Sequence, residues 1–279
     1  MSATTLPIQS TISGKLAMSK TRTWHAYATE VKFECLRALR APAFSIPFLL
    51  LPITLYVLFG VLLAGSMSHG DATVAKIMFV NWAVFGVMGP GMFGFGMFVA
   101  AEREQGLLTL KRALPMPAGA SLLAKMVMSM LFAAIVMITL IAAALVMGHP
   151  GLNFGQYCGI VLLYIAGSLP FSAIGLFIGT RTSAKSAPAF ANLAYLPFMH
   201  LGGLFYPLPK SVQPLEFISP AFYLDKLGLR LVGAPNLDRL ASGLSGPSSY
   251  GGPALYFAVL AGVTILFATL AIRRLARVG

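Results

Sequence analysis

Few residues in this sequence could carry chemistry, and the densest polar group is the run at 101–112. It reads Ala-Glu-Arg-Glu-Gln-Gly-Leu-Leu-Thr-Leu-Lys-Arg, and two prolines, Pro115 and Pro117, follow it. On each side lies an apolar segment with more than the roughly 20 residues that a bilayer-spanning helix needs. A short polar helix held between two spans is suited to receive force from a soluble partner. The run therefore predicts a coupling site rather than a catalytic one.

Catalytic motifs are absent from the sequence. It contains no His-Glu-x-x-His pattern for a metalloprotease, and Ser168 does not lie in the Gly-x-Ser-x-Gly turn of a hydrolase. A Gly-x-x-x-x-Gly-Lys-Ser/Thr phosphate loop is also missing, so ATP that drives the process must bind to another polypeptide. We expect a chain that is not an enzyme by itself and that binds no metal or cofactor.

The composition indicates an integral membrane protein. Apolar residues make up 57% of the 279 residues and charged residues 10%, with a mean hydropathy of +0.81, whereas soluble domains are about 25% charged. We expect an all-α integral membrane fold with six transmembrane helices. The apolar segments long enough to span lie at 45–64, 77–100, 121–147, 156–180, 187–206 and 253–272.

Basic residues lie mainly on one side of these predicted spans. Of the 20 Lys and Arg residues, 15 fall before the first span, after the last span, or in the second and fourth connections, where Lys125, near the start of the third span, is counted with the second connection. Because cytoplasmic loops carry the excess of positive charge, both termini are predicted to lie in the cytoplasm. The net charge of +12 flanks the spans and forms no patch on one domain, so nucleic acid is not an expected partner.

The chain divides into three predicted parts. Residues 1–22 are expected to form a disordered tail, and residues 23–41 a basic amphipathic helix that lies in the membrane interface and ends at Pro42. The six-span domain covers 42–279. Its polar coupling loop is 101–120, and its long outer loop, 207–252, is expected to begin with short helices.

Polar groups within the predicted spans are rare. Asn81 lies in the second span, and Asn192 and His200 lie in the fifth. Each is costly to bury unless it is paired, so each predicts either an interhelical hydrogen bond or a group that lines a cargo pathway. All eight acids lie outside the spans, which argues against an ion channel or a secondary carrier. Two sets of glycines have the spacing for close helix contact: Gly151, Gly155 and Gly159, and separately Gly175 and Gly179.

Two stretches together resemble a known family. The first is Glu-Arg-Glu-x-Gly-x-Leu-x-x-Leu-Lys-Arg-x-Leu-Pro, which starts at Glu102 and is followed by Lys125. The second is Gly-Gly-Leu-Phe-Tyr-Pro-Leu-Pro at 202–209, with Ile-Ser-Pro at 218–220 and Tyr223 after it. With six spans and an N-terminal interfacial helix, the chain from Trp24 onward resembles the membrane subunits of type-2 ABC exporters, the ABC-2 permease family with the type V exporter fold.

The resemblance implies an ATP-driven exporter in a bacterial inner membrane. Two permease subunits, most simply a homodimer, would pair around a pathway, and two cytoplasmic ABC ATPase subunits would bind ATP and Mg beneath them. The first cytoplasmic loop would be the coupling helix that docks on the ATPase, and Glu102→Ala would uncouple hydrolysis from transport while leaving the fold intact. The coupling residues are then Glu102, Arg103, Glu104, Gly106, Leu107, Lys111 and Arg112.

The resemblance also implies a cargo pathway along the second and fifth spans and an outer gate after the fifth. The implied pathway residues are Asn81, Phe85, Met92, Asn192, Tyr195, Met199 and His200. The implied gate residues are Leu204, Phe205, Tyr206, Pro207 and Tyr223. The expected cargo is an amphipathic small molecule, a drug or a lipid. Alternatives are a lipid-linked polysaccharide or, in other classes, an ion channel, a secondary carrier or a regulatory subunit.

Overall fold

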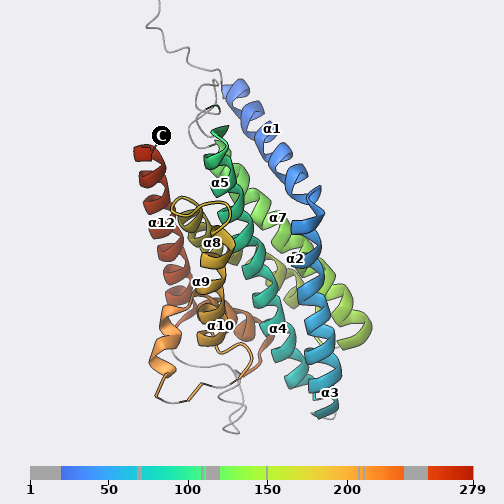
Figure 1. Cartoon of the computed structure of the whole chain (residues 1–279). Coiled ribbons are helices and arrows are strands. Elements are labelled where there is room, and N and C mark those ends of the chain that lie inside the picture. Colours follow the sequence, from blue (N-terminus) through green and yellow to red (C-terminus); the bar gives the residue numbers. More distant parts are fainter. Residues whose placement is uncertain are drawn as a thin grey trace, which may run out of the picture.

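The computed structural model describes residues 20–67, 71–107, 110, 120–148, 150–206, 208–209, 211–235 and 251–278. Helices are the regular elements of these ranges, and they pack side by side into one elongated bundle (Figure 1). The predicted all-α membrane class is therefore confirmed.

Five helical segments are long and apolar enough to cross a membrane, by length and composition. They cover Pro42–Ser66, Ala72–Glu104, Ser121–Gly148, Phe154–Gly179 and Pro253–Leu275. The first contains α2 (Pro42–Leu55), the π-helix η1 (Tyr56–Leu63) and α3 (Ala64–Met67), and the second contains α4 (Ala72–Gly89), the π-helix η2 (Pro90–Gly94) and α5 (Phe95–Glu104). The others are α7 (Ala120–Ala143) with η3 (Ala144–Gly148), α8 (Phe154–Gly179) and α12 (Pro253–Val278).

The predicted fifth span differs from the expectation. The helix there, α9 (Ala187–Leu201), has 15 residues and a length of about 22 Å, less than the hydrocarbon core of a bilayer. It stops because the chain turns at Gly202 and Gly203, and the φ of 68° at Gly203 lies in the left-handed region that favours glycine. The count of six full-length spans is therefore not confirmed for the described residues.

Two short helices follow α9 and complete the bundle beside it. They are the 3-10 helix η4 (Gln213–Ile218) and α10 (Pro220–Val232). Helix α10 contacts α4, α8, α9 and α12, and most of its residues are buried. The first part of the predicted outer loop is thus a packed part of the protein core.

The second span is the central element of the bundle. Of its most apolar window, 83% is buried, and α4 contacts α2, α7, α8 and α10. The π-helical stretch begins at Pro90, which has no backbone N–H to continue the regular hydrogen bonding. At the start of the chain, α1 (Lys20–Leu39) packs along α7. The start of α1, the end of α5 and the end of α12 lie at the same end of the bundle (Figure 1).

Candidate functional site

The predicted coupling run begins in the last turn of α5. Glu102 is fully buried there, Arg103 is half-buried, and Glu104, Gln105 and Gly106 are exposed. Gly106 has a φ of 70°, and its N–H donates to the Arg103 carbonyl at 3.2 Å. A left-handed glycine of this kind ends a helix at little steric cost. The chain therefore leaves α5 at Gly106 and presents an exposed turn at this end of the bundle.

A buried ion cluster fixes the end of α5 to two other helices. Lys125 on α7 donates to Glu34 Oε1 on α1 at 2.5 Å and to Glu102 Oε1 at 2.8 Å. Arg37 on α1 donates to the same Glu102 oxygen at 2.5 Å. Glu34, Lys125 and Glu102 are each at most 3% exposed. We call Glu34, Arg37, Glu102 and Lys125 the ion cluster.

The balance of charge makes the ion cluster tolerable. A buried ion costs several kcal/mol unless it is paired and hydrogen-bonded, and here two carboxylates face two cations.

The thiol of Cys35 lies next to Glu34 in the sequence, and its acidity is affected by the same surroundings. Burial and, after it, the negative charge of Glu34 raise the pKa of Cys35, so this cysteine stays protonated at neutral pH and is not a reactive thiolate.

The residues after the ion cluster hold the connection between α8 and α9. Arg103 donates to the carbonyl of Thr180 and, at 2.7 Å, to that of Thr182. Glu104 Oε1 accepts a hydrogen bond from the Ala184 N–H at 3.0 Å. The turn at 104–106 and the connection at 180–186 therefore form one continuous surface, which we call the docking rim.

Removing the Arg103 side chain is expected to release the 180–186 connection. Arg103→Ala deletes two charge-assisted hydrogen bonds, each worth about 1.5–3 kcal/mol before solvent screening. Because Arg181 and Lys185 are exposed in this connection, trypsin should cut after them about tenfold faster, as followed by mass spectrometry. Arg40→Ala, at an exposed basic residue after α1, is the control. Equal cleavage in both variants would show that Arg103 does not hold the connection.

The residues predicted to couple the chain to an ATPase fall into three groups. Glu102 and Arg103 contact their own chain and hold the site together. Glu104, Gly106 and the half-buried Leu107 belong to the turn. Lys111 and Arg112 lie outside the described residues.

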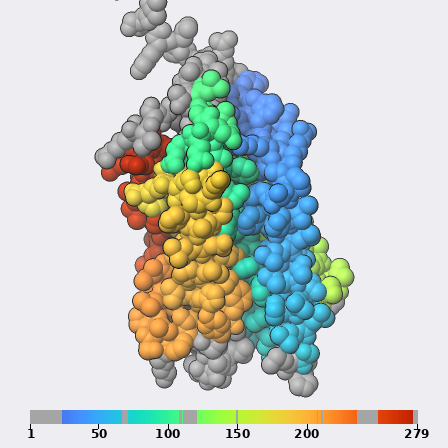
Figure 2. All heavy atoms as spheres, viewed as in Figure 1, coloured from blue at the N-terminus to red at the C-terminus, as the bar shows by residue number. Residues whose placement is uncertain are grey.

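Several residues implied for the pathway and the gate meet in one groove of about 480 Å³. The groove lies between η1, α4 and the end of α9. Its predicted members are Phe85, Met199, His200, Phe205 and Tyr206. The others are Leu55, Phe59, Leu63, Met78 and Trp82. In Figure 2, α1 and α2 form one side of the visible face, and α9 with the segment after it forms the other. We call the groove that these ten residues line the aromatic groove.

The other residues predicted to line the pathway do not line the aromatic groove. Asn81 is buried, and its amide donates to the Leu204 carbonyl. The Tyr195 hydroxyl donates to the Phe85 carbonyl at 3.1 Å. Met92 is fully buried in the core, whereas Asn192 is exposed on α9. Asn81 is therefore paired within the chain, with the turn after α9, and Tyr195 makes a hydrogen bond between α9 and α4.

The residues predicted to form the outer gate also lie in different places. Leu204 is fully buried, and Tyr223 on α10 donates its hydroxyl hydrogen to the Phe217 carbonyl at 2.9 Å. His200 lies beside Tyr206, with ring centroids 5.7 Å apart, and its Nδ1 is 2.8 Å from the Leu196 carbonyl of its own helix. Pro207 lies outside the described residues. No cluster of metal-ligating side chains occurs in the part of the chain that the structure describes.

The sequence is similar to known membrane transport proteins. A family model described as "ABC-2 type transporter" matches residues 25–225, a range that contains both the ion cluster and the aromatic groove. The curated protein named "Putative transport permease YvfS", from Bacillus subtilis (strain 168), is 25% identical over 207 residues, which are 72% of this chain and 84% of that protein. Because the family match covers more than half of the sequence, this multi-pass membrane protein belongs to the ABC-2 type transporter family.

Proposed function

We propose that this chain is the transmembrane subunit of an ATP-driven exporter that moves an amphipathic small molecule, a drug or a lipid out of the cytoplasm. Two copies would pair, and two ABC ATPase subunits, which bind ATP and Mg, would dock beneath them. The docking rim would face the cytoplasm of a bacterial cell, together with both chain termini, in agreement with the bias of Lys and Arg toward that side.

One observation carries this proposal: the docking rim and the aromatic groove share one helical segment. Ala72–Glu104 is a continuous segment of 33 residues, about 50 Å long. Its last turn carries Glu102 and Glu104, and its first half carries Trp82 and Phe85 of the groove. A displacement of the docking rim would therefore be transmitted to the aromatic groove along the backbone of this one helical segment.

The ion cluster and the π-helix give this segment its mechanical properties. The ion cluster ties the end of α5 to α1 and α7, so a force on the rim moves three helices together rather than bending one loop. The π-helix η2 lies between the rim and the groove, and such segments mark places where a helix changes direction. We infer that motion of the rim reorients the groove-lining half of the segment about η2.

The proposal predicts a bound motor. The full chain, tagged and extracted from its native host in mild detergent, should co-purify with a protein that carries a phosphate loop, and the complex should hydrolyse ATP. If the chain purifies without an ATPase even after gentle crosslinking, the motor-coupled function is wrong and a channel or carrier takes its place.

A substitution on the docking rim should weaken this association without unfolding the chain. Gln105→Arg places a bulky charge at an exposed position of the turn, and we expect at least a tenfold loss of co-purified ATPase, about 1.4 kcal/mol. Ala72→Arg is the matched control, because Ala72 is exposed at the other end of the same segment. Equal recovery of ATPase with both variants would place the docking surface elsewhere.

A further inference from the structure

The aromatic groove contains a buried hydrogen-bond donor without an acceptor. Trp82 lines the groove and is 5% exposed. Its indole Nε1 is buried, and no side chain or backbone group in the described ranges accepts its hydrogen. Leaving such a donor unsatisfied costs about 1–3 kcal/mol. A tryptophan held in this way has an unused recognition group at a site large enough for a ligand.

The rings around Trp82 favour a flat partner. Phe59 stacks on the indole, with centroids 5.9 Å apart and planes 16° apart, and Phe205 and Phe85 lie at 4.7 and 5.4 Å. Phe59 is 42% exposed, so part of this stacked pair of rings is accessible to a ligand. Aromatic groups arranged around a hollow bind another ring through its faces and edges.

The charge of the lining favours an uncharged ligand. None of the ten residues that line the groove is Asp, Glu, Lys or Arg. An ion that entered it would lose its hydration without gaining an opposite charge.

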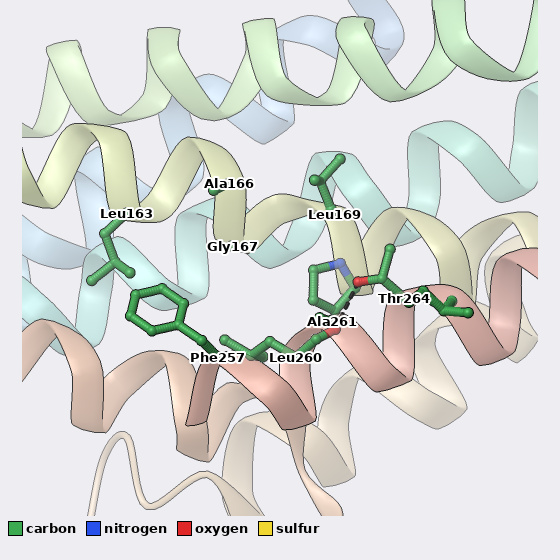
Figure 3. A pocket seen from close by; sticks show the side chains of 10 residues that line it. Leu163, Ala166, Gly167, Leu169, Phe257, Leu260, Ala261 and Thr264 are labelled. Atoms are coloured by element: carbon green, nitrogen blue, oxygen red, sulfur yellow. Dashed lines mark hydrogen bonds between the residues drawn. The ribbon is translucent and has the colours of Figure 1, made fainter. Parts of the chain in front are cut away.

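The hollow between α8 and α12 makes an instructive contrast. It measures about 270 Å³ and is lined mainly by aliphatic groups, among them Leu163, Leu169 and Leu260 (Figure 3). The Thr264 hydroxyl in it already donates to the Leu260 carbonyl at 2.7 Å. That hollow suits an acyl chain and offers no unused polar group, whereas the aromatic groove does.

We propose that the aromatic groove binds uncharged, ring-containing molecules that carry a carbonyl or similar hydrogen-bond acceptor, and that Trp82 Nε1 donates to that acceptor. The inference rests on the proposed function, because it names the class of cargo that the exporter would take. Binding itself needs no ATPase, so the two proposals can fail separately.

The test uses two probes that differ in one acceptor, 9-fluorenone and fluorene. The full chain is placed in lipid nanodiscs, and the retained probe is compared with that in empty nanodiscs. We expect 9-fluorenone to bind about five- to tenfold more tightly than fluorene, as one neutral hydrogen bond in a dry site would give. Trp82→Phe, which keeps a ring and removes the N–H, should abolish this preference, so that the variant binds the two probes equally.

The sequence supplies a matched control, because its other tryptophan, Trp24, is 75% exposed on α1. Trp24→Phe should bind both probes as the unmodified chain does. It also leaves Trp82 as the single indole, whose N–H proton signal in ¹H–¹⁵N spectra should move to lower field with 9-fluorenone and not with fluorene. This second measurement stands even if Trp82→Phe fails to fold.

Two outcomes would overturn the inference. If both probes bind equally, water or a neighbouring group satisfies the indole and Trp82 does not select cargo. If neither probe binds above empty nanodiscs while an ATPase still co-purifies, the proposed function stands and the groove is not its cargo site.

Discussion

Lys125→Met is expected to destabilise the purified chain by about 3–5 kcal/mol, the usual cost of breaking a buried ion pair by removing one partner. The ammonium of Lys125 is shared by Glu34 and Glu102, at 2.5 and 2.8 Å. Without it, two buried carboxylates repel each other in a site of low polarity. The midpoint of thermal unfolding in detergent, followed by size-exclusion chromatography of the soluble fraction, measures the effect.

Two further variants make this result interpretable. Lys32→Met removes an exposed lysine from α1 and should change the midpoint little. A triple variant, Glu34→Gln with Lys125→Met and Glu102→Gln, should recover much of the loss, because it removes the three buried charges together and leaves only Arg37, whose side chain is 39% exposed. A Lys125→Met variant as stable as Lys32→Met would mean that the ion cluster is not buried in the folded protein.

The ion cluster also changes the expectation for Glu102→Ala. The sequence analysis predicted that Glu102→Ala leaves the fold intact, but the Glu102 side chain is fully buried and accepts hydrogen bonds from Lys125 and Arg37. We now expect Glu102→Ala to destabilise the chain. A loss of transport in that variant would report a damaged site as readily as a lost partner contact, which is why Gln105 on the docking rim is the better position to change.

The membrane class and most of the spans could be predicted because hydropathy depends on composition and length alone. Lys125 was counted with the basic residues of the second connection, so no carboxylate partner was predicted for it. The identity of such a partner did not follow from the sequence, because Glu34 lies 91 residues away on a helix whose docking face is set by tertiary packing. The end of α9 was missed for a related reason: Gly202 and Gly203 read as part of an apolar run, and only the backbone conformation at Gly203 reveals the turn.

The aromatic groove shows the same limit within one helix. Phe85 was expected there and Trp82 was not, although the two lie three residues apart and therefore on one face of α4. In a span that is apolar all round, periodicity does not distinguish a groove-lining ring from a core ring, as Met92 in the core illustrates. The distinction comes from the short α9 and the turn after it, which bring Phe205 against Trp82 and Phe85 of α4.

The second large effect is expected where α8 meets η2 and α5 without side chains between them. A Cβ on Gly175 would overlap the carbonyl oxygen of Met92 and lie 2.7 Å from that of Gly91, and a Cβ on Gly179 would lie 3.0 Å from the Cα of Gly96. These neighbours are backbone atoms, so relief requires the two helices to separate. The small-residue spacing of Gly175 and Gly179 thus corresponds to a real backbone contact of the kind seen between membrane helices.

Gly175→Ala should lower the free energy of unfolding by about 1–3 kcal/mol or more, as overpacking in a rigid core does. The direction of this change in the free energy of unfolding is informative, because Gly→Ala within an unobstructed helix is normally stabilising by about 0.5–1 kcal/mol. Gly262→Ala on α12, where a Cβ would meet nothing within 4 Å, should be neutral or slightly stabilising in the same thermal assay. If Gly175→Ala behaved like Gly262→Ala, α8 and the central segment would have to lie farther apart than the structure places them. The helical segment that connects the docking rim with the aromatic groove would then not be held in place by packing against α8.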